Sequence, residues 1–268
     1  GTGPGRRSDA IHRMRSQHTI EAKALRFFVI NLDRSTERWH EIAQSAADIG
    51  VDVTRVPGTD GADIPVAEWR DVDHDRFRRS HGRIILPGEY GCYRSHLAAL
   101  QAVIDSGEAV AVICEDDIVL KPETPAAVAA ILEQKPDLHV LKLANHRIRG
   151  FVSHGGEGVG KFGRCVHGPQ GSAACYAVTR EGARILHDGL QTMWLPWDIA
   201  FERGWALNAR IYTVPRKVIG FSKLSRGSTI TTSRSSDYKS SKIPLFQRTP
   251  TLLFRAVDYV RRAAYALR

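Results

Sequence analysis

The chain has 268 residues, of which 43% are hydrophobic and 25% are charged, and it carries a formal net charge of +9. This length suits one α/β domain with additional segments at its ends. The composition excludes a membrane-spanning protein, because no apolar run approaches the roughly 18 to 20 residues that a span requires. The four cysteines show no disulfide framework and no zinc-type pair, so we expect reduced thiols in a cytoplasmic protein.

Residues 1–24 are polar and lack periodicity, which predicts a tail, and its first five residues resemble a cloning remnant. No charged segment followed by an apolar one opens the chain, so we expect no secretory signal. Arginines cluster in this tail, in residues 76–83 and near the C-terminus. Such clusters are either solvated faces or contacts to an anionic surface. Nucleic acid is not an expected partner, because the basic residues are not interleaved with aromatic ones.

The first elements predict the β-α-β opening of a nucleotide-binding sheet. Residues 26–32 form an apolar run, and Ser35 is a candidate N-cap for a helix that Gly50 ends. A second strand is predicted at residues 51–56. The following segment, up to residue 86, is predicted to be irregular, with a short helix near residues 65–70.

The later elements alternate between helices and strands. Helices are predicted at 87–105, 124–134, 179–189 and 246–268, and strands at 109–120, 138–143, 162–166, 172–178 and 209–214, with a Gly-rich separator at 150–161. This pattern divides the chain into a tail (1–24), an α/β domain (25–220), a mobile loop (221–245) and a basic amphipathic C-terminal helix (246–268). One face of that helix is apolar at Leu252, Leu253, Ala256, Val257, Val260, Ala264 and Leu267. This face fits either peripheral contact with an anionic membrane or packing against the domain.

Three consecutive acids, Glu115, Asp116 and Asp117, follow the apolar run that begins at residue 109. Ligands of open α/β sheets bind outside the carboxyl ends of strands. Because successive strand residues point to opposite faces, Glu115 and Asp117 are predicted to share one side, with Asp116 on the other. A divalent cation would relieve the repulsion between the two carboxylates, so the run predicts a metal site. The alternative is an acidic strand end that pairs with a nearby arginine.

Four motifs in order resemble glycosyltransferase family 25, the lipooligosaccharide-type galactosyltransferases of bacteria, to which the collagen galactosyltransferases are related. The motifs are Phe28-Val29-Ile30-Asn31-Leu32-Asp33-Arg34-Ser35 with Arg38, Gly88-Glu89-Tyr90-Gly91-Cys92 with Ser95-His96, Glu115-Asp116-Asp117, and Gly171-Ser172 with Tyr176 ahead of Gly182-Ala183. The similarity spans roughly residues 26–230.

The resemblance implies a GT-A-like nucleotide-sugar-binding fold with a mixed central sheet flanked by helices. It also implies an inverting transfer of a hexose, galactose first, from a UDP-sugar to a glycan or lipid-linked acceptor of lipopolysaccharide biosynthesis. Mn²⁺ or Mg²⁺ at Glu115 and Asp117 is then expected to neutralise the donor diphosphate. A non-catalytic sugar-binding or adhesion module with the same fold is the alternative.

The implied donor-binding residues are Asn31, Leu32, Arg34, Arg38, Ser95, His96, Glu115, Asp116, Gly171 and Ser172. For Arg34 and Arg38 the alternative is a solvated i, i+4 pair on a helix, and for His96 it is a buried structural histidine.

A general base must also be supplied. Asp198 is the first candidate, because it follows Trp194 and Trp197, whose indoles could raise its pKa and stack on a sugar. Its alternative role is to cap a helix at 199–203. Glu89 is the second candidate, with a favourable charge at a helix N-terminus as its alternative role. No histidine follows His187 to complete a metal site, which leaves Asp237 or a serine of residues 222–236 for that position.

Overall fold

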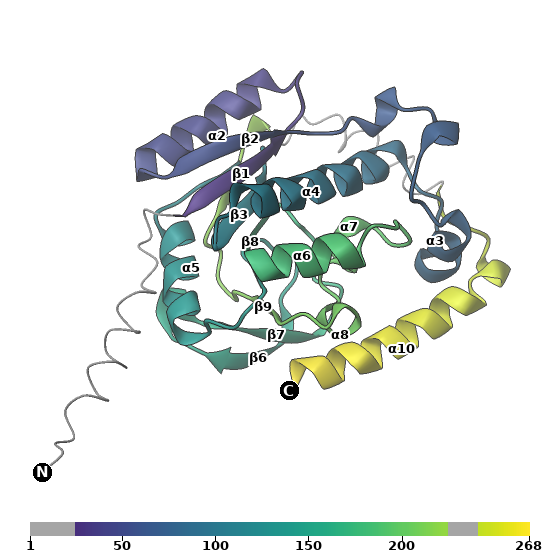
Figure 1. Cartoon of the computed structure of the whole chain (residues 1–268). Coiled ribbons are helices and arrows are strands. Elements are labelled where there is room, and N and C mark those ends of the chain that lie inside the picture. Colours follow the sequence, from purple (N-terminus) through teal and green to yellow (C-terminus); the bar gives the residue numbers. More distant parts are fainter. Residues whose placement is uncertain (1–24, 225–240) are drawn as a thin grey trace, which may run out of the picture.

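The computed structural model describes residues 25–224 and 241–268. The predicted tail, most of the predicted mobile loop and Asp237 lie outside the described residues. The part of the chain that is described is an α/β structure with a large mixed sheet between two layers of helices (Figure 1).

The large sheet has eight strands in the order β2-β1-β3-β8-β5-β9-β7-β6. The strands are β1 (Arg26–Asn31), β2 (Asp52–Pro57), β3 (Val110–Glu115), β5 (Val140–Lys142), β6 (Arg149–Gly155), β7 (Phe162–His167), β8 (Cys175–Thr179) and β9 (Ile211–Thr213). The pairs of β1 with β2, β1 with β3 and β5 with β9 are parallel, and the other pairs are antiparallel. A small second sheet pairs β4 (Ile118–Val119) with β10 (Gly220–Phe221).

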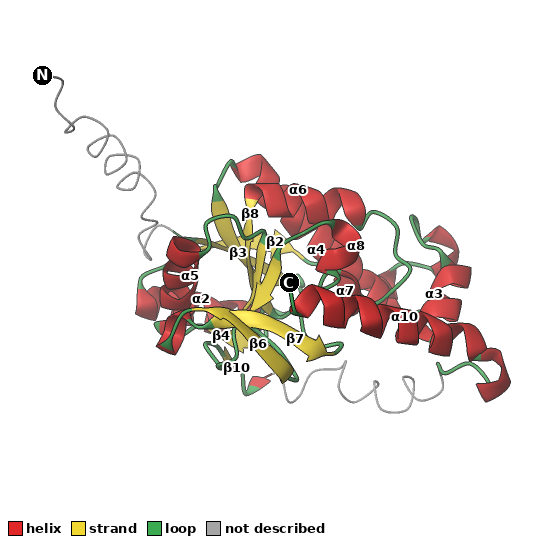
Figure 2. Ribbon diagram, turned by 90° about the horizontal axis from the view of Figure 1, so that it is seen from below, coloured by secondary structure: helices red, strands yellow, loops and turns green. Residues whose placement is uncertain are grey.

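The helices pack on both faces of the large sheet (Figures 1 and 2). They are α2 (Thr36–Ile49), α3 (His74–His81), α4 (Pro87–Ser106), α5 (Glu123–Gln134), α6 (Arg180–Gly189), α7 (Trp197–Ala200), α8 (Gly204–Leu207) and α10 (Thr249–Ala266), with short 3-10 turns η2 (Gly61–Asp63), η3 (Val66–Glu68), η4 (Gly158–Gly160) and η6 (Leu245–Gln247).

The inner strands β1, β3 and β8 carry apolar residues on both faces because they contribute to two cores. In β1, Phe27 and Val29 belong to a core with α2 and α5, whereas Phe28 and Ile30 belong to a core with α4, α6 and α7. Each face of a strand takes alternate residues, so burial on both faces requires a continuous apolar run. The mixed sheet flanked by helices is consistent with the GT-A-like fold that the sequence predicted.

The opening β1-α2-β2 unit is confirmed, and Gly50 ends α2 with a positive φ of 69°. The strand predicted at residues 109–120 is not continuous. β3 ends at Glu115, and Asp116 and Asp117 form a turn before β4. The chain turns here because β4 leaves the large sheet and pairs with β10, with Val119 opposite Gly220. Two of the three acids therefore lie in a turn and not in a strand.

Several elements were not predicted, and two of them, α3 and β6, are longer than four residues. The helix α3 lies in the segment predicted to be irregular, where Phe77 is the one fully buried apolar residue of eight mostly polar positions. The strand β6 lies in the Gly-rich separator and is the edge strand of the sheet, with partly exposed residues. Neither segment carries the apolar periodicity on which the sequence prediction relied.

Candidate active site

The carboxyl ends of β1 and β3 lie side by side, because the two strands are parallel and Ile30 is opposite Glu115. This register places Asn31 next to the acidic turn. The Asn31 Nδ2 atom donates to Asp116 Oδ2 at 2.7 Å, and Arg38 Nη1 of α2 donates to Asp116 Oδ1 at 3.3 Å. The first strand, the first helix and the acidic run thus meet at one edge of the sheet, as expected for a ligand site of this fold.

Asn31 has a positioning role in this arrangement. Its side chain is buried, and its amide also donates to Ser35 O at 2.9 Å and accepts from Arg55 Nε at 2.7 Å. Both N–H groups of the amide are therefore used by protein acceptors. The Asn31 side chain therefore holds Asp116 in place, and its direct contact with a donor stays a prediction.

Glu115 is oriented by a buried histidine. His96 is 1% exposed, and its Nε2 lies 3.2 Å from Glu115 Oε1 while its Nδ1 lies 3.2 Å from the Tyr176 hydroxyl. Burial holds the pKa of Tyr176 well above its usual value, so the phenol stays protonated and can donate to Nδ1. The Nε2–H then donates to the Glu115 carboxylate.

The His96 ring also stacks on Trp197, with ring centroids 4.9 Å apart and planes 4° apart. Both nitrogens and one face of the ring thus contact protein groups. The contacts of this buried ring match the alternative of a structural histidine, and contact of His96 with a donor stays a prediction.

Asp117 is the least satisfied acid of the site. Its Oδ1 atom is buried and has no hydrogen-bond partner among the described residues. Burial first, and then the neighbouring Glu115 and Asp116 charges, raise the pKa of Asp117 to about 7. Burial also raises the pKa of Asp116, although the hydrogen bond from Asn31 and the charge of Arg38 oppose this rise.

The acidic turn fits a divalent cation. A buried carboxylate oxygen without a partner, next to a second and a third carboxylate, is an all-oxygen donor set of the kind that Mn²⁺ and Mg²⁺ prefer. Arg38 pairs with Asp116, so the alternative reading, an acidic strand end that pairs with a nearby arginine, is observed for Asp116.

The sequence analysis missed one cluster of side chains whose atoms could ligate a metal ion. Ligand atoms of Cys92, His96 and Glu115 all lie within 4.8 Å of one another. Cys92 and His96 are four residues apart on α4, and this i, i+4 spacing could have indicated that they share a face. All four cysteines are free, as expected.

Gly171 and Ser172 connect the acidic turn to Asp198. The Glu115 N–H donates to Ala174 O at 2.9 Å, and the Ala174 N–H donates to Ser172 Oγ at 3.3 Å. Gly171 and Ser172 have φ values of 69° and 65°. A methyl group at Gly171 would lie 3.7 Å from Asp198 Oδ2, so the two residues are close neighbours.

The indoles next to Asp198 contact protein groups. Trp197 is buried between His96 and Phe201, and Arg76 lies 3.6 Å above the ring of Trp194. Trp194 is half-buried, and stacking of a sugar on these indoles stays a prediction. Asp198 itself is half-buried and lies inside α7, whose N-cap position is Pro196, so the capping alternative is also not observed.

The remaining predicted residues have structural partners. Ser95 is buried, donates to Gly91 O at 2.7 Å and accepts from Thr59 N at 2.8 Å. The Glu89 carboxylate accepts from Leu86 N at 2.9 Å at the start of α4. This hydrogen bond supports the helix-terminus alternative for Glu89.

Leu32 is half-buried and directly follows β1. Arg34 precedes α2 and pairs with Asp60, whereas Arg38 lies in α2 and pairs with Asp116, so the two arginines are not an i, i+4 pair on one helix. Arg38 has a partly exposed guanidinium next to the acids, and it remains the arginine best placed for a phosphate.

Comparison with known proteins agrees with this geometry. Residues 24–159, half of the chain, match the family described as "Glycosyltransferase family 25 (LPS biosynthesis protein)". A "Glycosyltransferase 25 family member" of Aedes aegypti is 27% identical over 113 residues, which is 40% of this chain and 18% of that protein. A protein of the same name from Drosophila pseudoobscura pseudoobscura is 29% identical over 112 residues, with the same coverage. The aligned part is thus less than a fifth of each of these relatives.

The mixed sheet flanked by helices is consistent with a GT-A-like glycosyltransferase fold. The chain belongs to glycosyltransferase family 25. The matched residues contain β1, α4 and the acidic turn, whereas Gly171, Ser172 and Asp198 lie beyond them.

Proposed function

We propose that this protein transfers a hexose from a UDP-sugar to a glycan or lipid-linked acceptor, with galactose as the first candidate and glucose as the second. The observation that carries the proposal is the buried, unpartnered Oδ1 of Asp117 next to Glu115 at the carboxyl edge of the sheet. Such a carboxylate pair is suited to hold a cation beside an anionic ligand. Galactose rests on the motif resemblance, and the free cysteines support a cytoplasmic location.

In this proposal Glu115 and Asp117 hold Mn²⁺ or Mg²⁺. The cation, when bound, would neutralise negative charge that develops on the leaving UDP. Asp116 keeps the acidic turn fixed to β1 and α2 through Asn31 and Arg38. His96 fixes the orientation of the Glu115 carboxylate. The part of the Arg38 guanidinium not used by Asp116 can donate to a phosphate oxygen.

The transfer is an inverting single displacement. The acceptor oxygen forms a bond to the anomeric carbon while the bond from that carbon to the UDP oxygen breaks, and the hydroxyl proton passes to a carboxylate. We assign this carboxylate to Asp198, because Asp198 lies close to Gly171. The segment that contains Gly171 also contains Ala174, whose carbonyl oxygen accepts from the Glu115 N–H. Glu89 is the second candidate, although its carboxylate already accepts a helix N–H.

We expect Asp198→Asn to lower kcat by about 10²- to 10⁴-fold with little change in KM for the donor, because the variant loses only the proton acceptor. The matched comparison is Glu89→Gln, which keeps an oxygen that can cap α4 and should retain most of the activity. Steady-state kinetics of both variants decide between the two acids. A large loss of kcat in Glu89→Gln with an active Asp198→Asn would move the base to Glu89.

The experiment that tests the function is a UDP-release screen of UDP-galactose, UDP-glucose and UDP-N-acetylhexosamines, with and without Mn²⁺. We expect release from one UDP-hexose that depends on the cation. Donor binding by calorimetry without release from any donor would instead favour a non-catalytic sugar-binding module.

A further inference from the structure

The C-terminal helix α10 packs against the domain with its polar face. Its buried residues are Thr251, Asp258, Arg262 and Ala266. The residues of the predicted apolar face point away from the domain, so the alternative in which this face packs against the domain is not observed. Exposure lies between 43% and 70% for Leu252, Leu253, Val257, Val260 and Leu267. These five residues form a continuous outward stripe, because they repeat with helical spacing. We call them the α10 stripe.

Specific polar contacts fix this orientation. Thr251 Oγ1 donates to Arg79 O at 2.8 Å, Arg262 Nη1 donates to Glu202 at 2.6 Å, and Asp258 accepts from Arg203 at 2.8 Å. Rotating α10 to bury its stripe would expose or break these buried ion pairs, which is costly. The stripe therefore stays on the surface of the folded domain.

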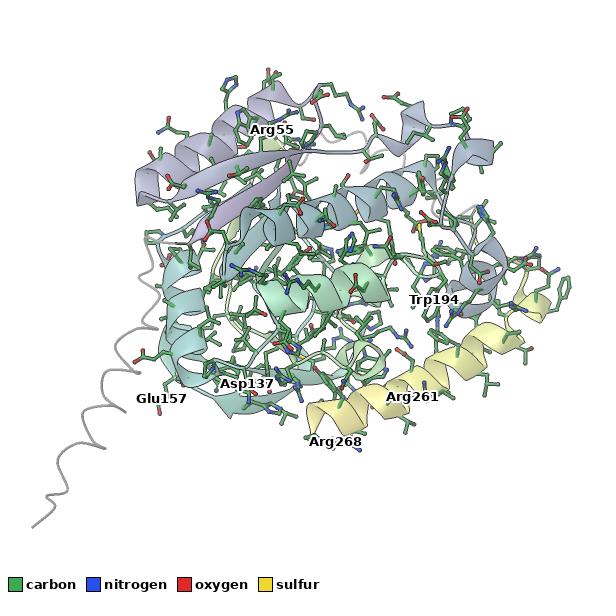
Figure 3. The ribbon with its side chains drawn as sticks, viewed as in Figure 1. Arg55, Asp137, Glu157, Trp194, Arg261 and Arg268 are labelled. Atoms are coloured by element: carbon green, nitrogen blue, oxygen red, sulfur yellow. The ribbon has the colours of Figure 1, made fainter. Side chains whose placement is uncertain are left out.

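The surface beside the stripe is positively charged. Arg255, Arg261 and Arg268 are exposed, but Arg255 donates to His81 O at 3.1 Å and so lies on the domain side of α10, whereas Figure 3 shows Arg261 and Arg268 along the helix. Asp258 is the single acid in residues 246–268, and it is buried against Arg203. No carboxylate of α10 thus offsets the exposed arginines.

The same edge of the molecule continues onto α3, which packs beside the N-terminal half of α10 (Figure 1). A cavity of about 320 Å³ lies there, lined by Arg78, Arg79, Asp75, Ile243 and Gln247. Phe246, next to this cavity in sequence, is 81% exposed. Cationic and apolar groups are therefore combined over both helices.

We propose that α10 docks on an anionic lipid bilayer, with its stripe in the acyl boundary and its arginines on lipid phosphates. None of the described helices is long and apolar enough to cross a membrane, so α10 would lie in the plane of the interface. Charge favours this occupant over a second copy of the chain, because a two-fold contact through the stripe would oppose the same arginines. The proposal does not rest on the proposed catalytic site.

Co-sedimentation with large unilamellar vesicles tests the proposal on the full chain. We expect binding to vesicles of 70% phosphatidylcholine and 30% phosphatidylglycerol, little binding to pure phosphatidylcholine, and weaker binding as salt rises. Leu253→Ser with Val260→Ser should weaken binding at least about tenfold, since two inserted side chains are lost. Arg261→Gln with Arg268→Gln should weaken it by about fivefold per charge on anionic vesicles only.

The matched control is Val66→Ser in η3, compared with Val260→Ser, because the two valines are 57% and 65% exposed. Val66→Ser should bind vesicles like the unsubstituted protein, and all variants should keep its circular dichroism spectrum. Equal binding by the stripe variant, or no preference for phosphatidylglycerol, overturns the proposal. The proposal is also overturned if the protein does not bind vesicles and instead forms a dimer in analytical ultracentrifugation that is lost in Leu253→Ser with Val260→Ser.

Discussion

Asp117→Asn is expected to lose transfer activity and to gain thermal stability. The activity loss follows from the proposed cation site, where Asp117 is one of two ligands, and we expect kcat to fall by at least about 10²- to 10³-fold. The stability gain follows from the buried Oδ1, which has no hydrogen-bond partner among the described residues, and from the repulsion by Glu115 and Asp116. An amide removes the charge that burial penalises.

The sign of the stability effect depends on pH. The pKa of Asp117 is raised from 3.8 to about 7 in the fold, so the folded chain holds this proton more tightly than the unfolded chain. Stability is therefore lost as pH rises from about 4 to about 7, and the loss is complete above that range. We expect Asp117→Asn to melt several degrees above the unsubstituted protein at pH 8 and close to it near pH 4.

Differential scanning fluorimetry with and without Mn²⁺ checks this prediction independently of turnover. Saturating Mn²⁺ should raise the Tm of the unsubstituted protein, because a hundredfold excess over Kd adds about 2.7 kcal/mol to the free energy of unfolding. The Tm of Asp117→Asn should not change. The control is Asp188→Asn, whose carboxylate is 82% exposed. If Asp117→Asn kept its activity and its Mn²⁺ response, the metal site would have to be abandoned.

The sequence predicted the sheet edge better than the roles of its residues. Asn31 and the acids were expected together because β1 and β3 end at the same edge, and local patterns define those ends. That the Asn31 and His96 side chains are already hydrogen-bonded to the acids could not be predicted from the sequence. Their partners, Asp116 and Glu115, are distant in sequence, and whether a polar side chain is already satisfied is decided by such tertiary contacts.

The face of α10 illustrates the same limit. The apolar periodicity of this helix was read correctly, but periodicity does not say which face meets the domain. The inward face is fixed by Glu202, Arg203 and the Arg79 carbonyl, which come from α3 and the segment after α7. The helix α3 and the strand β6 were missed for a related reason, since partners elsewhere in the chain stabilise segments with little apolar pattern of their own.

Glu202 is the residue that ties α10 to the candidate site. It is buried, and its carboxylate accepts from Lys142 Nζ at 2.9 Å, from Arg262 Nη1 at 2.6 Å and from Gln170 N at 3.1 Å. Lys142 Nζ also donates to Gly171 O at 3.3 Å. Burial alone would raise the pKa of Glu202, but Lys142 and Arg262 hold it below its usual value. Glu202 is therefore ionised between two buried cations.

Glu202→Gln is expected to lower the free energy of unfolding by about 3 to 5 kcal/mol, because Lys142 and Arg262 remain buried without their counter-charge. This corresponds to a Tm about 10 °C lower for a chain of this size. Urea denaturation measures the change. The control is Glu157→Gln at an exposed position, whose free energy of unfolding should stay within about 0.5 kcal/mol of that of the unsubstituted protein.

The effect of Glu202→Gln depends on pH. Because the pKa of Glu202 is lowered in the fold, its stabilising contribution is full above the unfolded pKa near 4.5 and is lost as pH falls through the folded pKa. The difference between Glu202→Gln and the unsubstituted protein should therefore shrink only in strong acid. Replacing the network together, as Glu202→Leu with Lys142→Met and Arg262→Met, should recover much of the loss, because no buried charge is then left unpaired. If Glu202→Gln lowered the free energy of unfolding by less than about 1 kcal/mol, α10 would be held mainly by its other contacts.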